Sequence, residues 1–323
     1  MITGIHHTGL VVRDLDAAIA FYAAGADFAV VSRFAIADTP ATRELLQVPD
    51  AAGEAALLRG TLGCIELFAF AANRARPECR PAVSQAGIRH ICVQGALDDV
   101  LFSRLADAGA AWHARPSGLG TGNLYAYIRD PEGNILEVEG VPWAPAGEPR
   151  AWYAHTALVT PDIDRLSAFY ARVTGAPVHR RGSFGPDVKF DVVGGFDNAR
   201  FHGAWLRTAN AELEFWQYLE PETSPEPRRR VSDLGWNHLC FETDDLAADI
   251  ARLTADGVEL HGPAMDFGGA SVAYARDPDG NVFELLQPAA QSSLTVAALA
   301  ADSGARALHH ARTPHFAPAA DGA

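Results

Sequence analysis

The chain carries the same spaced pattern of histidines and glutamates twice. The first pattern has spacings of 59, 24 and 47 residues and consists of His7, Glu66, His90 and Glu137. The second has spacings of 59, 24 and 46 residues and consists of His155, Glu214, His238 and Glu284. The surrounding sequence repeats as well, so that Gly87-x-x-His90-x-Cys92 returns as Gly235-x-x-His238-x-Cys240. Two diverged copies of about 148 residues, followed by a tail, give a firmer domain count than length alone.

Composition limits the partners of such a chain. Its 323 residues are 48% hydrophobic, which suits about two ordinary globular domains. The net charge of -14 argues against nucleic acid and anionic membrane as partners, since both need a basic surface. No signal peptide is evident, no apolar stretch approaches the roughly 20 residues of a membrane span, and the four cysteines lack disulfide-framework spacing. We expect a soluble, cytoplasmic protein with a small-molecule substrate, and homo-oligomerisation is left open.

Each copy divides into two modules of similar plan. Alternating apolar residues predict strands, and helical periodicity predicts helices. In the first copy the predicted order is strand 5–12, helix 15–24 and strands 28–34, 55–58 and 63–70, then strand 88–94, helix 97–109 and strands near 111–114, 123–129 and 134–140. The unit of one strand, one helix and three strands is therefore used four times, which predicts an α+β fold.

The predicted boundaries follow the repeat. The first domain covers residues 1–141 and the second covers 151–288, with a proline-rich linker at 142–150. Residues 289–323 form an alanine-rich tail that we expect to be flexible, apart from a short helix around 294–310. The tail histidines are expected to be solvated rather than ligating, and they are His309, His310 and His315.

Four βαβββ modules with these repeated motifs resemble the vicinal oxygen chelate (VOC) superfamily. This superfamily includes glyoxalase I, methylmalonyl-CoA epimerase, fosfomycin-resistance proteins and extradiol dioxygenases. The resemblance covers residues 3–288. The residues that carry it are His7-Thr8-Gly9-Leu10 with Phe21-Tyr22, then Glu66, His90 and Asp130-Pro131-Glu132-Gly133-Asn134 with Glu137, each with a counterpart in the second copy. It implies modules paired into two VOC domains, with curled sheets that enclose a barrel-like cleft and ligands on the inner faces of the first and last strands.

A strand period of two separates neighbouring histidine candidates. His7 and His6 point to opposite faces, and the second copy keeps His155 at the His7 position but has Ala154 at the His6 position. His7 is therefore the predicted ligand, and His6 is expected to be an ordinary, partly exposed residue.

The repeat also separates neighbouring glutamates. Glu137 is preferred to Glu139 because only Glu137 has a counterpart, Glu284. Glu214 is preferred to Glu212 because the sequence Glu66-Leu67-Phe68 matches Glu214-Phe215-Trp216.

Imidazoles and carboxylates together are the ligand set of a borderline divalent metal. Burying four such groups toward one cleft without a cation would cost roughly several kcal/mol through desolvation and like-charge repulsion. We predict a divalent ion (Fe, Mn, Ni, Co or Zn) in at least one copy, and a second ion is left open. The predicted ligands are His7, Glu66, His90, Glu137, His155, Glu214, His238 and Glu284. Module one could close on module two, or on module four, which would place His7 with His238 and Glu284.

Residues that recur beside the ligands are the candidates for catalysis: Tyr127, Tyr274, His113 and His261, together with the ligands Glu137 and Glu284. The two tyrosines stand three residues before an Asp-Pro turn, where inward strands would bring them into the cleft. The two histidines stand at the end of a neighbouring predicted strand. They are either residues of a surface turn or an acid or base near the metal. Cys92 and Cys240 are expected to fill the core or to place a thiol near the metal.

The number of ligands separates the candidate reactions. Two histidines and two glutamates leave about two open positions on a six-coordinate ion, which suits a bidentate substrate and a metal-stabilised enediolate. This favours a lyase or isomerase of the glyoxalase or epimerase type.

Two other classes remain as alternatives. An Fe(II) extradiol dioxygenase needs two histidines and one carboxylate. The resemblance to these enzymes implies a further histidine shortly before the Tyr-x-x-Asp-Pro segment, but residues 265–267 contain none and His261 lies too far upstream. The two-domain architecture nevertheless resembles dioxygenases more than most lyases. A non-enzymatic protein that sequesters a ligand is the third class, and such relatives tend to lose the metal residues that this chain keeps twice.

Overall fold

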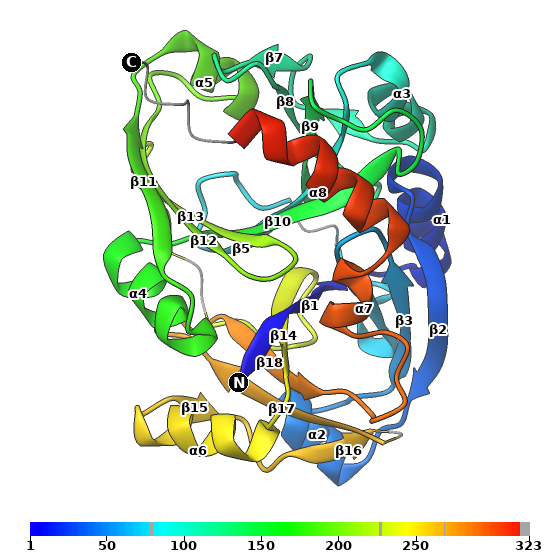
Figure 1. Ribbon diagram of the computed structural model, residues 1–323. Coiled ribbons are helices and arrows are strands. Elements are labelled where there is room, and N and C mark those ends of the chain that lie inside the picture. The colour runs from blue at the N-terminus through cyan, green and yellow to red at the C-terminus, as the bar shows by residue number, and fades with distance from the viewer. Residues whose placement is uncertain (78–79, 226–227, 268, 317–323) are drawn as a thin grey trace, which may run out of the picture.

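The computed structural model describes residues 1–77, 80–225, 228–267 and 269–316. These residues form two mixed β-sheets flanked by helices (Figure 1). Each sheet is built from two modules with the order strand, helix and three strands, and short extra elements are inserted in the loops. The α+β fold of four βαβββ modules that the sequence predicts is confirmed.

The first sheet joins module one to module four. Its strand order is β15-β17-β18-β14-β1-β4-β3-β2, with β16 beside β17. Module one supplies β1 (Ile2–Val11), β2 (Ala29–Ile36), β3 (Gly53–Arg59) and β4 (Cys64–Phe70). Module four supplies β14 (Gly235–Thr243), β15 (Glu259–Leu260), β16 (Met265–Phe267), β17 (Ala270–Arg276) and β18 (Val282–Gln287).

The second sheet joins module three to module two. Its strand order is β11-β12-β13-β10-β5-β9-β8-β6, with β7 beside β8. Module three supplies β10 (Ala151–Val159), β11 (Val178–Phe184), β12 (Arg200–Arg207) and β13 (Glu212–Glu220). Module two supplies β5 (Gly87–Ala96), β6 (Ala111–Trp112), β7 (Ser117–Gly118), β8 (Leu124–Arg129) and β9 (Ile135–Val141).

The swapped pairing is thus the one that forms. Each sheet takes one module from each sequence copy, because β1 pairs antiparallel with β14 and β10 pairs antiparallel with β5. The segments 1–141 and 151–288 describe the repeat in the sequence, but neither closes on itself as a sheet.

The two faces of each sheet are buried in different clusters. Leu10 and Leu158 belong to the largest cluster, which extends over both sheets and contains the inward residues of the main helices. The next residues along the strands, Val11 and Val159, belong to two separate clusters, one for each sheet. Near the centre of the molecule the Thr8 and Thr156 hydroxyl oxygens, which are equivalent in the repeat, lie 2.7 Å apart.

One helix of each module packs against its sheet. These helices are α1 (Leu15–Ala26), α3 (Asp99–Asp107), α4 (Ile163–Thr174) and α6 (Leu246–Ala255). An aspartate caps the N-terminus of each, and the carboxylates of Asp14 and Asp162 accept from the amides of the third residue beyond them. Asp14 and Asp162, which are 148 residues apart and hence equivalent in the repeat, are therefore both helix caps.

Two further helices lie inside modules one and three and have no predicted counterpart. They are α2 (Pro40–Leu46) and α5 (Val188–Gly194), and a 3-10 turn covers Ala71–Asn73. A Thr39 cap followed by proline is a start signal for α2 that the periodicity analysis missed. Leu45 and Leu46 of α2 join the cluster of the first sheet, and Val193 of α5 joins that of the second.

The repeated Phe-Tyr and Asp-Pro motifs connect the two sheets. Tyr22 of α1 donates its hydroxyl to Asp130 Oδ2 at 3.0 Å, and Tyr170 of α4 donates to Asp277 Oδ2 at 3.0 Å. Each tyrosine belongs to one sheet and its aspartate to the other. Burial raises the pKa of Asp130 to about 6 and that of Asp277 to about 7. The motifs that carry the resemblance are thus structural cross-links.

The tail is ordered where the structure describes it. It forms α7 (Val296–Ala300) and α8 (Ser303–Phe316), and α8 runs across the front of the molecule in Figure 1. Leu299 and Leu308 are buried, and Leu308 packs with Trp143 and Trp152. The region where the sequence predicts a short helix, around 294–310, contains α7 and part of α8, and the flexibility of the tail stays a prediction. His309 and His310 are exposed, and the side chain of His315 lies outside the described residues.

No helix among the described residues is long and apolar enough to cross a membrane.

The cross-links give a testable prediction. Tyr22→Phe and Tyr170→Phe each remove a hydrogen bond to a buried carboxylate, so each should lower the free energy of unfolding by about 1.5–3 kcal/mol in urea titrations. Tyr125→Phe is the matched control, because its hydroxyl meets Thr121 at an exposed position and its loss should stay within about 0.5 kcal/mol. Equal losses in all three variants would contradict the role of the cross-links.

Candidate metal centres

The first sheet gathers four of the predicted ligands, which we call centre 1: His7 of β1, Glu66 of β4, His238 of β14 and Glu284 of β18. His7 Nε2 lies 3.2 Å from His238 Nε2 and 3.2 Å from Glu66 Oε2. Glu284 Oε2 lies 3.4 Å from each of the two Nε2 atoms. The His238 ring lies against Gly9, where a Cβ atom would come within 2.0 Å of it, so the strand needs glycine at this position.

The second sheet gathers the other four, which we call centre 2: His90 of β5, Glu137 of β9, His155 of β10 and Glu214 of β13. Glu137 Oε2 lies 2.9 Å from His90 Nε2 and 3.0 Å from His155 Nε2. Glu214 Oε2 lies 3.1 Å from His155 Nε2 and 3.9 Å from His90 Nε2. All eight predicted ligands therefore converge, in two groups that mix the sequence copies.

The geometry of both groups fits a divalent ion. Two ligand atoms about 2.1 Å from a shared ion lie about 3.0–3.4 Å apart when their angle is about 90–109°, and most separations above fall in or near this range. Within the described residues, the buried Glu284 Oε2 has no hydrogen-bond partner, as expected of an oxygen that faces an ion. Burial opposes ionisation of Glu66, but His7 and His238 hold its pKa well below its usual range.

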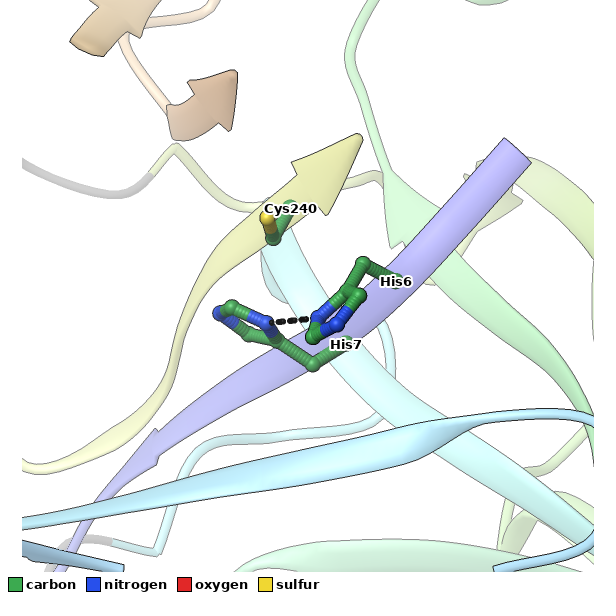
Figure 2. Close-up of side chains that lie close together, drawn as sticks. All are labelled: His6, His7 and Cys240. Carbon is green, nitrogen blue, oxygen red and sulfur yellow. Dashed lines mark hydrogen bonds between the residues drawn. The ribbon is translucent and has the colours of Figure 1, made fainter. Parts of the chain in front are cut away.

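His6 differs from its prediction. It is only 3% exposed, and its Nδ1 lies 2.8 Å from His7 Nδ1. The period-two argument fails here because the register of β1 against β14 shifts between Ile5 and His7, so the strand is irregular at His6. Figure 2 shows the His6 and His7 rings meeting, with Cys240 nearby on β14.

His6 orients the ring of its neighbour, His7. Burial, with a smaller contribution from His7, lowers the pKa of His6 to about 3, so this ring is neutral. Its Nε2 lies 3.4 Å from the Leu294 carbonyl oxygen, which can only accept. His6 therefore donates from Nε2 and accepts at Nδ1 from His7, which directs His7 Nε2 toward centre 1. Although burial opposes the charged form of His7, the neighbouring Cys240 and Glu66 raise its pKa well above its usual value, and a bound ion would replace the proton. The repeat could not reveal this role, because Ala154 occupies the equivalent position.

The two cysteines lie beside the centres. Cys240 Sγ lies within 4.8 Å of a ring nitrogen of His6 and of His7. Cys92 Sγ lies within 4.8 Å of a carboxylate oxygen of Glu137 and a ring nitrogen of His155. Burial raises the pKa of both thiols well above the usual value, so they are neutral. They fill the core and border the centres at the same time.

The candidate tyrosines and histidines form a second layer. The ring centroid of Tyr127 is 5.1 Å from that of His90, and the Tyr274 centroid is 5.5 Å from that of His238. His261 stacks on Tyr274, with its Nδ1 3.1 Å from the Leu45 carbonyl oxygen of α2. The half-buried His113 packs edge-on against Tyr127, with the ring centroids 6.3 Å apart. The tyrosines thus contact ligand rings, whereas both histidines lie behind tyrosines.

The glutamates that the sequence set aside have other roles. Glu212 pairs with Arg207 Nη2 at 2.6 Å, away from the centre. Glu139 is buried and accepts hydrogen bonds from Gln94 and Asn123. Burial and the nearby Glu137 raise the pKa of Glu139 to about 7. Sequence reasoning missed this residue because Leu286 replaces it in the other copy.

Comparisons with known proteins agree with this architecture. The family model described as "Glyoxalase/Bleomycin resistance protein/Dioxygenase superfamily" matches residues 4–138 and 152–285. A lactoylglutathione lyase of Pseudomonas aeruginosa is 29% identical over 145 residues, which are 42% of this chain and 81% of that protein. One of Arabidopsis thaliana is 28% identical over 138 residues, which are 42% of this chain and 44% of that protein.

Solved structures share the fold. Glyoxalase I from Zea mays has a TM-score of 0.63 at 18% identity, over 97% of each chain. A putative dioxygenase from Bacillus subtilis has a TM-score of 0.61 at 15% identity, over 97% of this chain and 94% of that one. At these identities the likeness concerns the fold alone. The family model, which matches most of each sequence copy, shows that the chain belongs to the glyoxalase/bleomycin resistance protein/dioxygenase superfamily.

Proposed function

We propose that the protein is a divalent-metal-dependent lyase or isomerase of the glyoxalase type, which acts on a small substrate with two adjacent oxygens. The observation that carries this proposal is the convergence of two histidines and two glutamates in each sheet. Lactoylglutathione lyases among the relatives support it. We propose the divalent ion, the substrate with two adjacent oxygens and the centre that acts on it together.

The side chains around each centre suit proton transfer next to a carbonyl. A divalent ion held there would supply the positive charge that polarises the substrate and stabilises an enediolate. The histidines are fixed in the sheet and orient the site, while a ligand carboxylate takes a proton from one carbon and returns it to the next. Tyr274 and Tyr127 pack against the ligand rings and help to hold them in place.

Helix α2, which is inserted in module one, packs beside centre 1. Leu45 and Leu46 of α2 pack in one cluster with Phe68 and Tyr274 beside centre 1. The ligand side chains of centre 1 are at most 13% exposed. A substrate must therefore displace or pass α2 to reach this centre, and closure of the helix afterwards would keep water out.

The ligand count supports this class over the dioxygenase. A ring-cleaving Fe(II) site needs one carboxylate and must keep a face free for both the catecholate and O₂. In centre 1 both Glu66 and Glu284 lie within 3.4 Å of His7 Nε2, so the second carboxylate occupies part of that face. Ligand sequestration without chemistry would not require such a set twice.

Metal content tests the ligand assignment. The purified protein should hold between one and two divalent ions per chain, released by a chelator. His90→Ala and His238→Ala should each empty one centre, because the structure places them in different sheets, and the double variant should hold almost none. His309→Ala, at an exposed tail position, is the matched control. Full metal content in the double variant, measured by elemental analysis, would rule out both centres.

The role of His6 can be measured separately. In a His90→Ala background, which isolates centre 1, His6→Ala should weaken metal affinity about 10- to 100-fold, the usual scale for losing a partner of a ligand histidine. Competition titration with a chromophoric chelator gives this number. An unchanged affinity would mean that the His6–His7 contact does not orient the ligand.

Activity tests the reaction. The substrate probe is a 2-oxoaldehyde mixed with glutathione, whose hemithioacetal is isomeric with a thioester such as lactoylglutathione. The double variant Glu66→Gln/Glu214→Gln should lower kcat about 10²–10⁴-fold, the scale for losing a positioned acid–base group. Thioester absorbance measures the reaction. Oxygen uptake with catechols that persists in this double variant would instead favour the dioxygenase.

A further inference from the structure

The carboxylate of Glu214 is held by two tryptophans. Trp205 Nε1 donates to Glu214 Oε1, and Trp216 Nε1 donates to Glu214 Oε2 at 2.9 Å. The register of the sheet produces this arrangement, because Trp205 on β12 is directly opposite Glu214 on β13, and Trp216 follows two residues later on the same face. Each carboxylate oxygen thus has an indole donor, and Oε2 also faces the ligand histidines His155 and His90.

The surroundings keep the two indoles in place. A Cβ atom at Gly203 would lie 2.6 Å from the Trp205 ring and 2.7 Å from the Trp216 ring, so the absence of a side chain there makes room for both. The Arg180 guanidinium lies 3.7 Å from the centroid of the Trp205 ring. Phe184 packs edge-on against both indoles. These contacts fix the two indoles, and the indoles in turn fix the orientation of the Glu214 carboxylate.

In the part of the chain that the structure describes, centre 1 has no equivalent of this arrangement. At the repeat offset, Leu57 replaces Trp205 and Phe68 replaces Trp216, and neither side chain has an N–H group to donate. Ala55 takes the place of Gly203. The register is otherwise the same, since Leu57 is directly opposite Glu66 as Trp205 is opposite Glu214. The two centres share their ligands and differ in what restrains one glutamate.

We infer that Trp205 and Trp216 are positioning residues that make centre 2 a fixed metal site, and that turnover takes place in centre 1. A Glu214 carboxylate that swung away from the ion would leave two indole N–H groups unpaired in a largely buried site. Glu66 breaks no such bonds when it moves. The inference rests on the proposed function for its catalytic half, whereas the restraint on Glu214 concerns metal retention and can be tested without a substrate.

Metal release is the first test. Protein loaded with Co²⁺ and mixed with excess chelator should lose the metal in two phases, with centre 2 as the slow one. The His238→Ala and His90→Ala variants assign the phases, because each leaves one centre intact. Trp205→Leu/Trp216→Phe puts the residues of centre 1 around Glu214, and it should accelerate the slow phase about 10- to 100-fold while the fast phase stays constant.

Controls separate this effect from damage to the fold. Trp143→Phe changes another buried tryptophan, which packs against Trp152 and the tail, and it should leave both phases unchanged. The single variant Trp216→Phe removes one indole donor with a smaller change in volume, and it should show an intermediate acceleration. An unchanged slow phase in both the double and the single variant would overturn the inference.

Activity is the second test. Glu66→Gln should lower kcat at least tenfold more than Glu214→Gln does, because only the first alters the centre in which turnover is placed. Equal losses in the two variants would overturn the assignment of turnover to centre 1. If neither variant nor wild-type protein acts on the hemithioacetal, the proposed function fails. The release phases then still decide whether the tryptophans fix Glu214.

Discussion

The antiparallel pairing of β1 with β14, and of β10 with β5, is the constraint on which both metal centres depend. It brings His7 next to His238 and His155 next to His90, although these partners lie in different copies of the repeat. The parallel strands on either side then add one glutamate each. If each copy closed on itself, the same residues would form different sets. The backbone ladder between modules therefore determines which ligands meet.

Much of the architecture follows from the sequence because it depends on local periodicity and on duplication. The four modules and all eight ligand candidates are visible in this way, since alternation assigns a face and the repeat removes coincidences. Module pairing is not visible. Either partner of module one would bury equivalent strands and bring together two histidines and two glutamates, so the pattern does not distinguish them.

The features that sequence reasoning missed have two physical causes. Strict alternation places His6 on the face opposite His7, but an irregularity in β1 breaks that alternation. Glu139, Trp205 and Trp216 have no counterpart with the same chemistry in the other copy, so comparison of the copies rejected them or passed over them. A repeat highlights what the two centres have in common and hides what differs between them.

The two centres have the same types of ligand, and they differ in the residues next to those ligands. Centre 1 has a neutral imidazole that orients His7 through a carbonyl of the tail segment. Centre 2 has the buried carboxyl group of Glu139 nearby and two indole donors on Glu214. In a water-poor interior such contacts act strongly on a charged group, so neighbours of the ligands can change a site without replacing any ligand.

The swapped topology also bears on how such a molecule can change over time. Because every centre needs one module from each copy, two identical half-length chains could build the same pair of sheets as a symmetric dimer, and each substitution would then appear in both centres at once. Joining the halves in a single polypeptide removes that obligation. One centre can acquire tryptophans and the other a second histidine beside a ligand. The covalent link between the copies therefore allows substitutions to be selected at one centre without changing the other.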